Sequence, residues 1–284
     1  MDSLFVEREN PPHLLLADEH VDVWTLPLEI LPALRNRLAD YLSSAEQYRA
    51  SHFHFDLHRN RFITGRGSLR FILGCYLGVD PKLLEFVDGP QGKPSLAPMP
   101  KHSPLQFNLA HSDSLGIVAV TRSASVGVDI ERICPVPEMN ELVERFFAPR
   151  ENRAFQELPT ELKPSAFFNL WTRKEAWLKA TGQGIGHHLH QVEVSFLPGE
   201  PARLLALPGE LQFGEEWSLR DLKPAPGFAA ALAVSGREPH VTCRRWDFSQ
   251  STDLSNDPSG RSPWGNPTLS RISASRQQGL FAKP

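Results

Sequence analysis

Hydrophobic residues recur at helical spacing in several parts of the chain. In residues 58–77 the apolar positions fall on one stripe, and Gly78 follows the last of them. Residues 164–180 have the strongest helical pattern, with Pro164 in the first turn. Shorter helices are predicted in three further segments, residues 31–48 with a second helix start at Ser43, residues 142–147, and from residue 149 onward.

Short apolar runs between these helices predict strands, at residues 107–109, 115–120, 126–133, 192–196, 204–207, 217–222 and 228–233. Residues 116–120 and 227–232 both begin with glycine, continue with small apolar residues and follow a long helix. This repeated order predicts an α+β fold of two similar halves, residues 1–122 and 123–248. Residues 249–284 are polar and lack an apolar period, which predicts a disordered tail.

The composition is that of a globular chain. It has 284 residues, 40% of them hydrophobic, a formal net charge of −3 and three cysteines without metal-ligand spacing. These values exclude collagen-like, disulfide-rich and wholly disordered proteins. No apolar run approaches the roughly 18 residues of a membrane helix, and the start of the chain lacks the apolar centre of a signal peptide. We therefore expect a cytoplasmic protein that acts neither at a membrane nor on nucleic acid.

The strand at residues 126–131 alternates between apolar and acidic positions. Asp129 and Glu131 share one face, where next neighbours are roughly 7 Å apart, so both carboxylates can reach one cation. An edge strand with a solvated acidic face explains the same pattern. Glu175 favours the cation, because it lies on or beside the apolar stripe of the helix at residues 164–180. A lone carboxylate at such a position is costly unless it is paired or bound to a metal.

Three oxygen ligands without a histidine or cysteine cluster suit Mg²⁺ or Mn²⁺ rather than zinc. An ordinary helix-surface ion pair between Glu175 and Lys179 is the plainer interpretation of the third carboxylate, but it leaves the inward placement unexplained. Mg²⁺ takes other ligands from substrate phosphates, so nearby cations are candidate phosphate contacts. These candidates are Arg61, Arg66, Lys93, His111, Lys174 and Lys179. The residues therefore indicate metal-assisted phosphoryl or pyrophosphate chemistry.

Four motifs follow one another along the chain. They are Gly-Lys-Pro at residues 92–94, Phe-Asn-Leu-Ala-His-Ser at 107–112, Gly-Val-Asp-Ile-Glu at 127–131 and Trp-Thr-Arg-Lys-Glu-Ala-Trp-Leu-Lys at 171–179. In this order they resemble the motifs of the Sfp-type 4'-phosphopantetheinyl transferases, over about residues 43–234. The Gly-Lys-Pro motif is weak alone, whereas the last two motifs together are highly specific.

The resemblance implies a monomer with coenzyme A in the cleft between two α+β halves. Enzymes of this family move the phosphopantetheine arm of coenzyme A onto a serine of an acyl or peptidyl carrier protein and release 3',5'-ADP. Asp129, Glu131 and Glu175 match the metal ligands. Glu175 also matches the proposed base for the serine, and Lys179 the residue proposed to assist the leaving group. The matched coenzyme A phosphate contacts are Arg61, Lys93, His111 and Lys174; Arg66 is added from its place on the same helix.

The chain departs from the family pattern at the expected phosphate clamp. Ala110 stands where the pattern has a serine, and the lysines expected upstream of Phe53 are missing, with Arg49 nearby. Two other functions stay open at this point. One is a metal-dependent phosphoesterase acting on coenzyme A or a nucleotide, and the other is a non-catalytic module that binds coenzyme A or carrier proteins. The intact acidic trio and both lysines count against the second.

Overall fold

The computed structural model describes residues 5–6, 14–99, 104–183, 189–207 and 216–246. Its helices are α1 (Pro32–Ala39), α2 (Ser44–Ser51), α3 (Asp56–Leu77), α4 (Met139–Phe146), α5 (Pro149–Gln156) and α6 (Lys163–Thr181). Its strands are β1 (Phe5–Val6), β2 (His20–Pro27), β3 (Phe86–Asp88), β4 (Pro94–Leu96), β5 (Gln106–Ser112), β6 (Leu115–Thr121), β7 (Val126–Arg132), β8 (Glu193–Val194), β9 (Leu204–Ala206), β10 (Trp217–Leu222), β11 (Phe228–Ser235) and β12 (His240–Arg245).

The helix ends follow local sequence signals. Helix α2 begins at a capping box, in which the Glu46 N–H donates to Ser43 Oγ and the Ser43 N–H donates to the Glu46 carboxylate, at 3.3 and 2.8 Å. Gly78 and Gly182 follow α3 and α6 with φ angles of 65° and 71°, a left-handed conformation that glycine adopts without steric cost. These signals confirm the second helix start at Ser43 and the predicted ends of both long helices.

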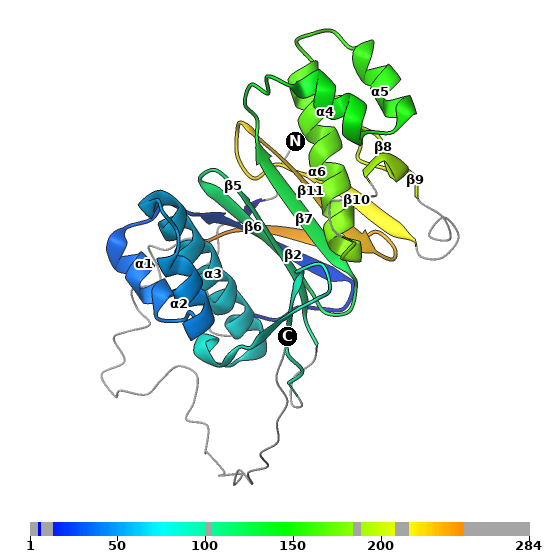
Figure 1. The fold of residues 1–284 in the computed structure, drawn as a ribbon. Helices are drawn as coiled ribbons and strands as arrows, with labels where there is room; N and C mark the ends of the chain where they lie inside the picture. Colours follow the sequence, from blue (N-terminus) through cyan, green and yellow to red (C-terminus); the bar gives the residue numbers. More distant parts are fainter. Residues whose placement is uncertain (1–4, 7–13, 100–103, 184–188, 208–215, 247–284) are drawn as a thin grey trace, which may run out of the picture.

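Two sheets lie face to face between two layers of helices. The larger sheet has the strand order β1-β12-β2-β6-β5, and the smaller has the order β10-β11-β7. Figure 1 shows α1, α2 and α3 on the outer side of the larger sheet and α6 on the outer side of the smaller one. The two glycine-led strands noted in the sequence, β6 and β11, are the central strands of these sheets. The α+β class with two similar halves is confirmed.

Both faces of the inner strands are buried. Val126, Val128 and Ile130 of β7 pack in the core between the sheets, together with Ile117 and Ala119 of β6. The intervening residues of β7 face helix α6. The alternation predicted for this strand is therefore correct, and its acidic face lies against a helix rather than in solvent.

Five strands were not predicted, namely β1, β2, β3, β4 and β12, and β12 changes the division into halves. Strand β12 runs parallel to β2 and pairs with it from His240↔His20 to Arg245↔Thr25. The chain therefore returns to the N-terminal sheet after completing the C-terminal one, so the last strand of the predicted C-terminal half, residues 123–248, lies in the sheet of the N-terminal half. Strand β5 also extends to Ser112, which leaves a shorter hairpin turn than predicted.

The disordered tail predicted for residues 249–284 lies outside the described residues. Among the helices that the structure describes, none is long and apolar enough to cross a membrane. All three cysteines are free thiols; Cys75 and Cys243 are buried and Cys134 is exposed.

Candidate active site

Helix α6 crosses directly over Gly127 of strand β7. A Cβ atom at this position would lie 2.1 Å from the carbonyl oxygen of Ala176 and 2.3 Å from the backbone nitrogen of Ala180. Only glycine allows this approach, because both neighbouring atoms belong to the helix backbone. The close crossing brings Glu175 and Lys179 of the helix to Asp129 of the strand.

The acidic residues meet on the face of β7 that α6 covers. Asp129 and Glu175 are 3% and 2% exposed. Burial raises the pKa of Asp129 to about 7; the Lys179 ammonium opposes this effect, and the Glu131 and Glu175 carboxylates add to it. Burial also raises the pKa of Glu175, with a further contribution from Glu131. The three predicted metal ligands therefore share one electrostatic environment.

Two oxygens of this cluster fit a cation. Asp129 Oδ2 and Glu175 Oε1 are buried and have no hydrogen-bond partner among the described residues. Buried carboxylate oxygens without a partner are costly, and a hard divalent cation is the ligand that such oxygens accept. Across the described residues, however, no three His, Cys, Asp or Glu side chains are gathered into a formed metal centre. Glu131 Oε2 instead accepts a hydrogen bond from Ser112 Oγ at 2.7 Å.

Lys179 links the carboxylates to the N-terminal half. Its Nζ lies 2.6 Å from Asp129 Oδ1, and its side chain is 30% exposed. Burial lowers the pKa of His111, and the nearby charges of Lys179 and Arg61 lower it further. His111 therefore lies between the cation of α6 and the arginine of α3, as expected of residues that contact one polyanion.

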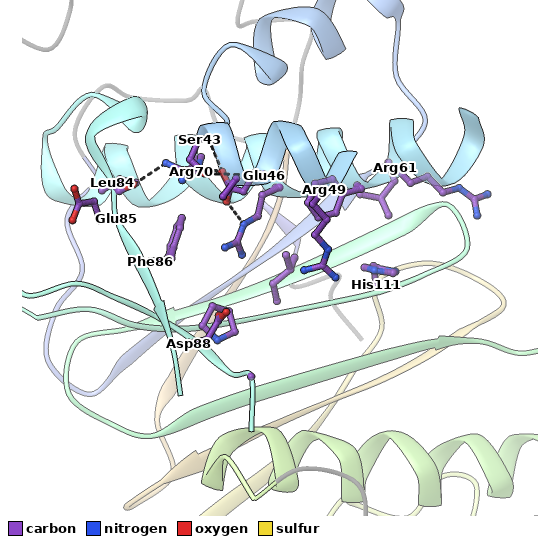
Figure 2. A pocket seen from close by; sticks show the side chains of 18 residues that line it. Ser43, Glu46, Arg49, Arg61, Arg70, Leu84, Glu85, Phe86, Asp88 and His111 are labelled. Carbon is purple, nitrogen blue, oxygen red and sulfur yellow. Dashed lines mark hydrogen bonds and ion pairs between the residues drawn. The ribbon is translucent and has the colours of Figure 1, made fainter. Parts of the chain in front are cut away.

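A cleft of about 810 Å³ opens in the N-terminal half. Helices α2 and α3 form one wall, and residues of β3, β4 and β5 form the other. Figure 2 shows the side chain of Arg49 extending from α2 toward the strand that carries His111. The cationic residues in the lining are Arg49, Arg61, Arg66, Arg70 and His111. Three of the six predicted phosphate contacts thus lie here, although every lining residue comes from the N-terminal half.

Two carboxylates hold Arg61 at the mouth of the cleft. Its Nη2 lies 2.5 Å from Glu29 Oε1 and 2.8 Å from Asp113 Oδ1. Asp113 also pairs with Arg132 at the end of β7, at 2.9 Å. Arg61 is therefore already paired with two carboxylates where it lines the cleft.

Two predicted phosphate contacts are not brought to the cleft. Lys93 Nζ donates to the carbonyls of Val126 and Ala180, at 2.9 and 3.0 Å, and so ties the loop after β3 to the end of α6. Lys174 is fully buried, forms an ion pair with Glu151 and donates to the Leu189 carbonyl at 2.8 Å. It directly precedes Glu175, and one helical step of about 100° turns it toward the core of the C-terminal half.

Two residues of the Phe-Asn-Leu-Ala-His-Ser motif join the halves, a role that sequence analysis missed. Asn108 is buried, and its Oδ1 accepts a hydrogen bond from the Val128 N–H at 2.9 Å. Ser112 Oγ accepts from the Arg132 N–H at 3.1 Å while it donates to Glu131. A polar residue within an apolar strand pattern was the signal available. The motif therefore fixes β5 against β7, and His111 faces the cleft from the same strand.

The raised pKa of Asp129 predicts a pH-dependent stability without divalent metal. Between the unfolded value of 3.8 and the folded value of about 7, the native state binds more protons, so stability falls as pH rises through this window. We expect metal-free protein to melt several degrees higher at about pH 5.5 than at about pH 8. Asp129→Asn should flatten this part of the profile, as measured by calorimetry. An unchanged profile in the variant would contradict the assignment.

The arginine-lined cleft suits an anionic, phosphate-bearing substrate, and the buried carboxylates beside it are of the kind that a hard divalent cation accepts. Residues 125–233 match the family model of the 4'-phosphopantetheinyl transferase superfamily. The 4'-phosphopantetheinyl transferase HetI of Nostoc sp. is 43% identical over 226 residues, which are 80% of this chain and 92% of HetI. The chain belongs to the 4'-phosphopantetheinyl transferase family, as its motifs predicted, and its enzyme class is that of a transferase.

Two further comparisons are more distant. A protein of Synechocystis sp. is 41% identical over 151 residues, 53% of this chain and 61% of its own length. The crystal structure of Helicobacter pylori holo-[acyl-carrier-protein] synthase in complex with coenzyme A is 24% identical over 39% of this chain and 99% of its own, with a TM-score of 0.30. A score this low does not guide the interpretation of the site.

Proposed function

We propose that this protein transfers the 4'-phosphopantetheine arm of coenzyme A to a serine side chain of an acyl or peptidyl carrier protein and releases 3',5'-ADP. One observation carries the proposal: an arginine-lined cleft ends beside a buried carboxylate cluster, with His111 between them. The cleft suits the phosphates of coenzyme A, and the carboxylates suit the cation that accompanies a pyrophosphate. The family supports the same reaction.

The cleft arginines bind the phosphates. In the described residues Arg49 has no ion-pair partner; its guanidinium carbon lies 5.3 Å from the ring centroid of Phe62. It takes the place of the family's missing lysines as a phosphate contact. Arg66 and His111 line the same cleft as Arg49. Arg61 also lines it and binds a phosphate in addition to, or in place of, its carboxylate partners. Lys93 and Lys174 keep the structural contacts described above.

Asp129, Glu131 and Glu175 would hold the divalent cation, Mg²⁺ or Mn²⁺. When bound, the ion neutralises charge that develops on the phosphate oxygens. The two unpartnered oxygens of Asp129 and Glu175 support this assignment. Glu131 would be the third ligand, and its Oε2 also accepts a hydrogen bond from Ser112 Oγ.

Glu175 accepts the proton of the attacking serine. A carboxylate whose pKa is raised by burial is a stronger base than an exposed one, which suits a hydroxyl nucleophile. The serine oxygen forms a bond to the phosphorus that bears pantetheine, and the bond from this phosphorus to the bridging oxygen breaks. The bridging oxygen leaves with the ADP half, and Lys179 stabilises the negative charge that it gains.

A transfer assay tests the proposed function. The full chain is incubated with an apo carrier protein, coenzyme A and Mg²⁺, and intact-mass spectrometry follows the carrier. We expect the carrier to gain the mass of one phosphopantetheine group and 3',5'-ADP to appear in equal amount. A carrier in which the acceptor serine is alanine is the control and should stay unmodified.

The phosphoesterase alternative gives a different result in the same assay. Hydrolysis of coenzyme A without carrier, and no mass gain with it, would overturn the transferase assignment. The family of the chain disfavours this outcome. Replacement of Mg²⁺ by Mn²⁺ in parallel reactions measures the metal preference.

We also propose a monomer that works in the cytoplasm. The resemblance to the Sfp-type transferases implies a monomer, and the composition of the chain supports the cytoplasm. Light scattering should therefore give a single species near 31.8 kDa.

A further inference from the structure

Arg66 is held in a fixed orientation inside the cleft. Its Nε donates to Glu46 Oε1, and its guanidinium carbon lies 4.4 Å from the centroid of the Phe86 ring. The two terminal nitrogens have no partner in the part of the chain that the structure describes, and the side chain is 18% exposed. One edge and one face of the guanidinium are thus occupied, while the end that can form two parallel hydrogen bonds stays available.

Glu46 is itself anchored by Arg70 and by the backbone of Ser43. Its Oε2 accepts from Arg70 Nε at 2.6 Å and from the Ser43 N–H at 2.8 Å. Arg70 is 2% exposed, and its Nη1 donates to the carbonyls of Pro81 and Leu84 at 3.1 and 2.8 Å. Burial would raise the pKa of Glu46, but the hydrogen bonds from both arginines outweigh it and lower the pKa. The anchored, ionised carboxylate therefore holds the Arg66 guanidinium in one orientation.

We propose that Glu46 is a positioning residue for coenzyme A, which holds Arg66 so that its terminal nitrogens meet a phosphate in the cleft. The proposal rests on the proposed function and adds a part to it. Glu46 touches no substrate, and it acts through Arg66. A guanidinium already oriented loses little side-chain freedom when it binds a phosphate with two hydrogen bonds.

If Glu46 acted only through its negative charge, its neutralisation would have the opposite effect on coenzyme A binding. Glu46 is a negative group in the wall of a site for a polyanion, so its neutralisation should tighten binding if it only contributed charge. Positioning predicts weaker binding instead. Glu85 offers a matched control, because it also lines the cleft but its side chain forms no ion pair among the described residues. Figure 2 labels both residues among those that line the cavity.

The test is calorimetric titration of coenzyme A into the full chain. Glu46→Gln should raise the dissociation constant roughly ten- to a hundredfold, as for the loss of a charge-assisted contact. Glu85→Gln should leave it unchanged or lower it. In a double-mutant cycle, Arg66→Ala should weaken binding by itself, and adding Glu46→Gln should then change the affinity little.

Several outcomes would overturn the proposal. The first is that Glu46→Gln binds coenzyme A as tightly as wild type or more tightly. The second is that Glu46→Gln weakens binding equally with and without Arg66, which would indicate a purely structural role. Because Glu46 also caps α2, Phe86→Leu is a second variant that removes the ring beneath Arg66 and keeps the carboxylate. It should weaken binding only where Arg66 is present, and weakening without Arg66 contradicts the proposal. Wild-type protein that binds no coenzyme A would instead overturn the proposed function.

Discussion

Asp129→Asn should abolish transfer to the carrier protein while the chain stays folded. The variant keeps the shape of the side chain but loses the charge that a divalent cation requires. Mutation of residues that merely support a metal ligand costs about ten- to a hundredfold in activity, so loss of a ligand itself should exceed about a hundredfold. The fold should tolerate the change, because burial destabilises the charged form of this carboxylate, and Glu131 and Glu175 add to the effect.

The measurement is carrier mass gain over time at several Mg²⁺ concentrations. Asp40→Asn makes the same chemical change at an exposed carboxylate after helix α1, and it should react like wild type. Near-wild-type turnover of Asp129→Asn at ordinary Mg²⁺ would contradict the proposal that three carboxylates hold the cation. Partial recovery at high Mg²⁺ would strengthen it, since a weakened site fills by mass action.

Gly127→Ala should destabilise the C-terminal half severely. The added methyl group would lie far inside contact distance of two backbone atoms of α6, and a helix backbone cannot move aside as a flexible side chain does. We expect a loss of about 3 kcal/mol or more in the free energy of unfolding, at the upper end for overpacking. Activity should fall as well, because a displaced α6 carries Glu175 and Lys179 away from Asp129.

Gly65→Ala is the matched control within helix α3. A Cβ there would be 3.5 Å from the nearest atom, the side chain of Leu28, which is an ordinary contact. Alanine in a helix interior is favoured over glycine by about 1 kcal/mol, so this variant should be as stable as wild type or more stable. Chemical denaturation measures both variants. Equal stability of Gly127→Ala and wild type would contradict the described crossing of α6 over β7.

Local signals predicted the parts of the fold that depend on neighbouring residues. The capping box at Ser43, the glycines after α3 and α6, and the alternation of β7 each act within a few residues. They can therefore be recognised in a single sequence. The meeting of Asp129 and Glu175 could be predicted for the same reason, because strand and helix periodicity placed each carboxylate on the face that the other approaches, and their role as metal ligands with Glu131 stays a prediction.

Distant pairings and side-chain partners could not be predicted in this way. Strand β12 owes its place to β2, more than two hundred residues earlier in the chain. From the sequence, Lys174 is predicted to contact phosphate. The structure instead pairs it with Glu151 on another helix. The sequence indicates only that Glu46 belongs to the helix start at Ser43. Its ion pairs with two arginines of α3 are visible only in the structure. Such roles follow from tertiary contacts, which a single sequence does not record.

The return of β12 to the N-terminal sheet sets the order in which the protein can be completed during synthesis. Strand β2 is hydrogen-bonded to β6 on one side and to β12 on the other. Until residue 245 has left the ribosome, one edge of β2 is open, and its apolar side chains stand next to unpaired backbone groups. A fragment ending at residue 122 would keep this open edge permanently. The N-terminal half therefore cannot be released as a finished unit, and it becomes complete only when the end of the other half arrives.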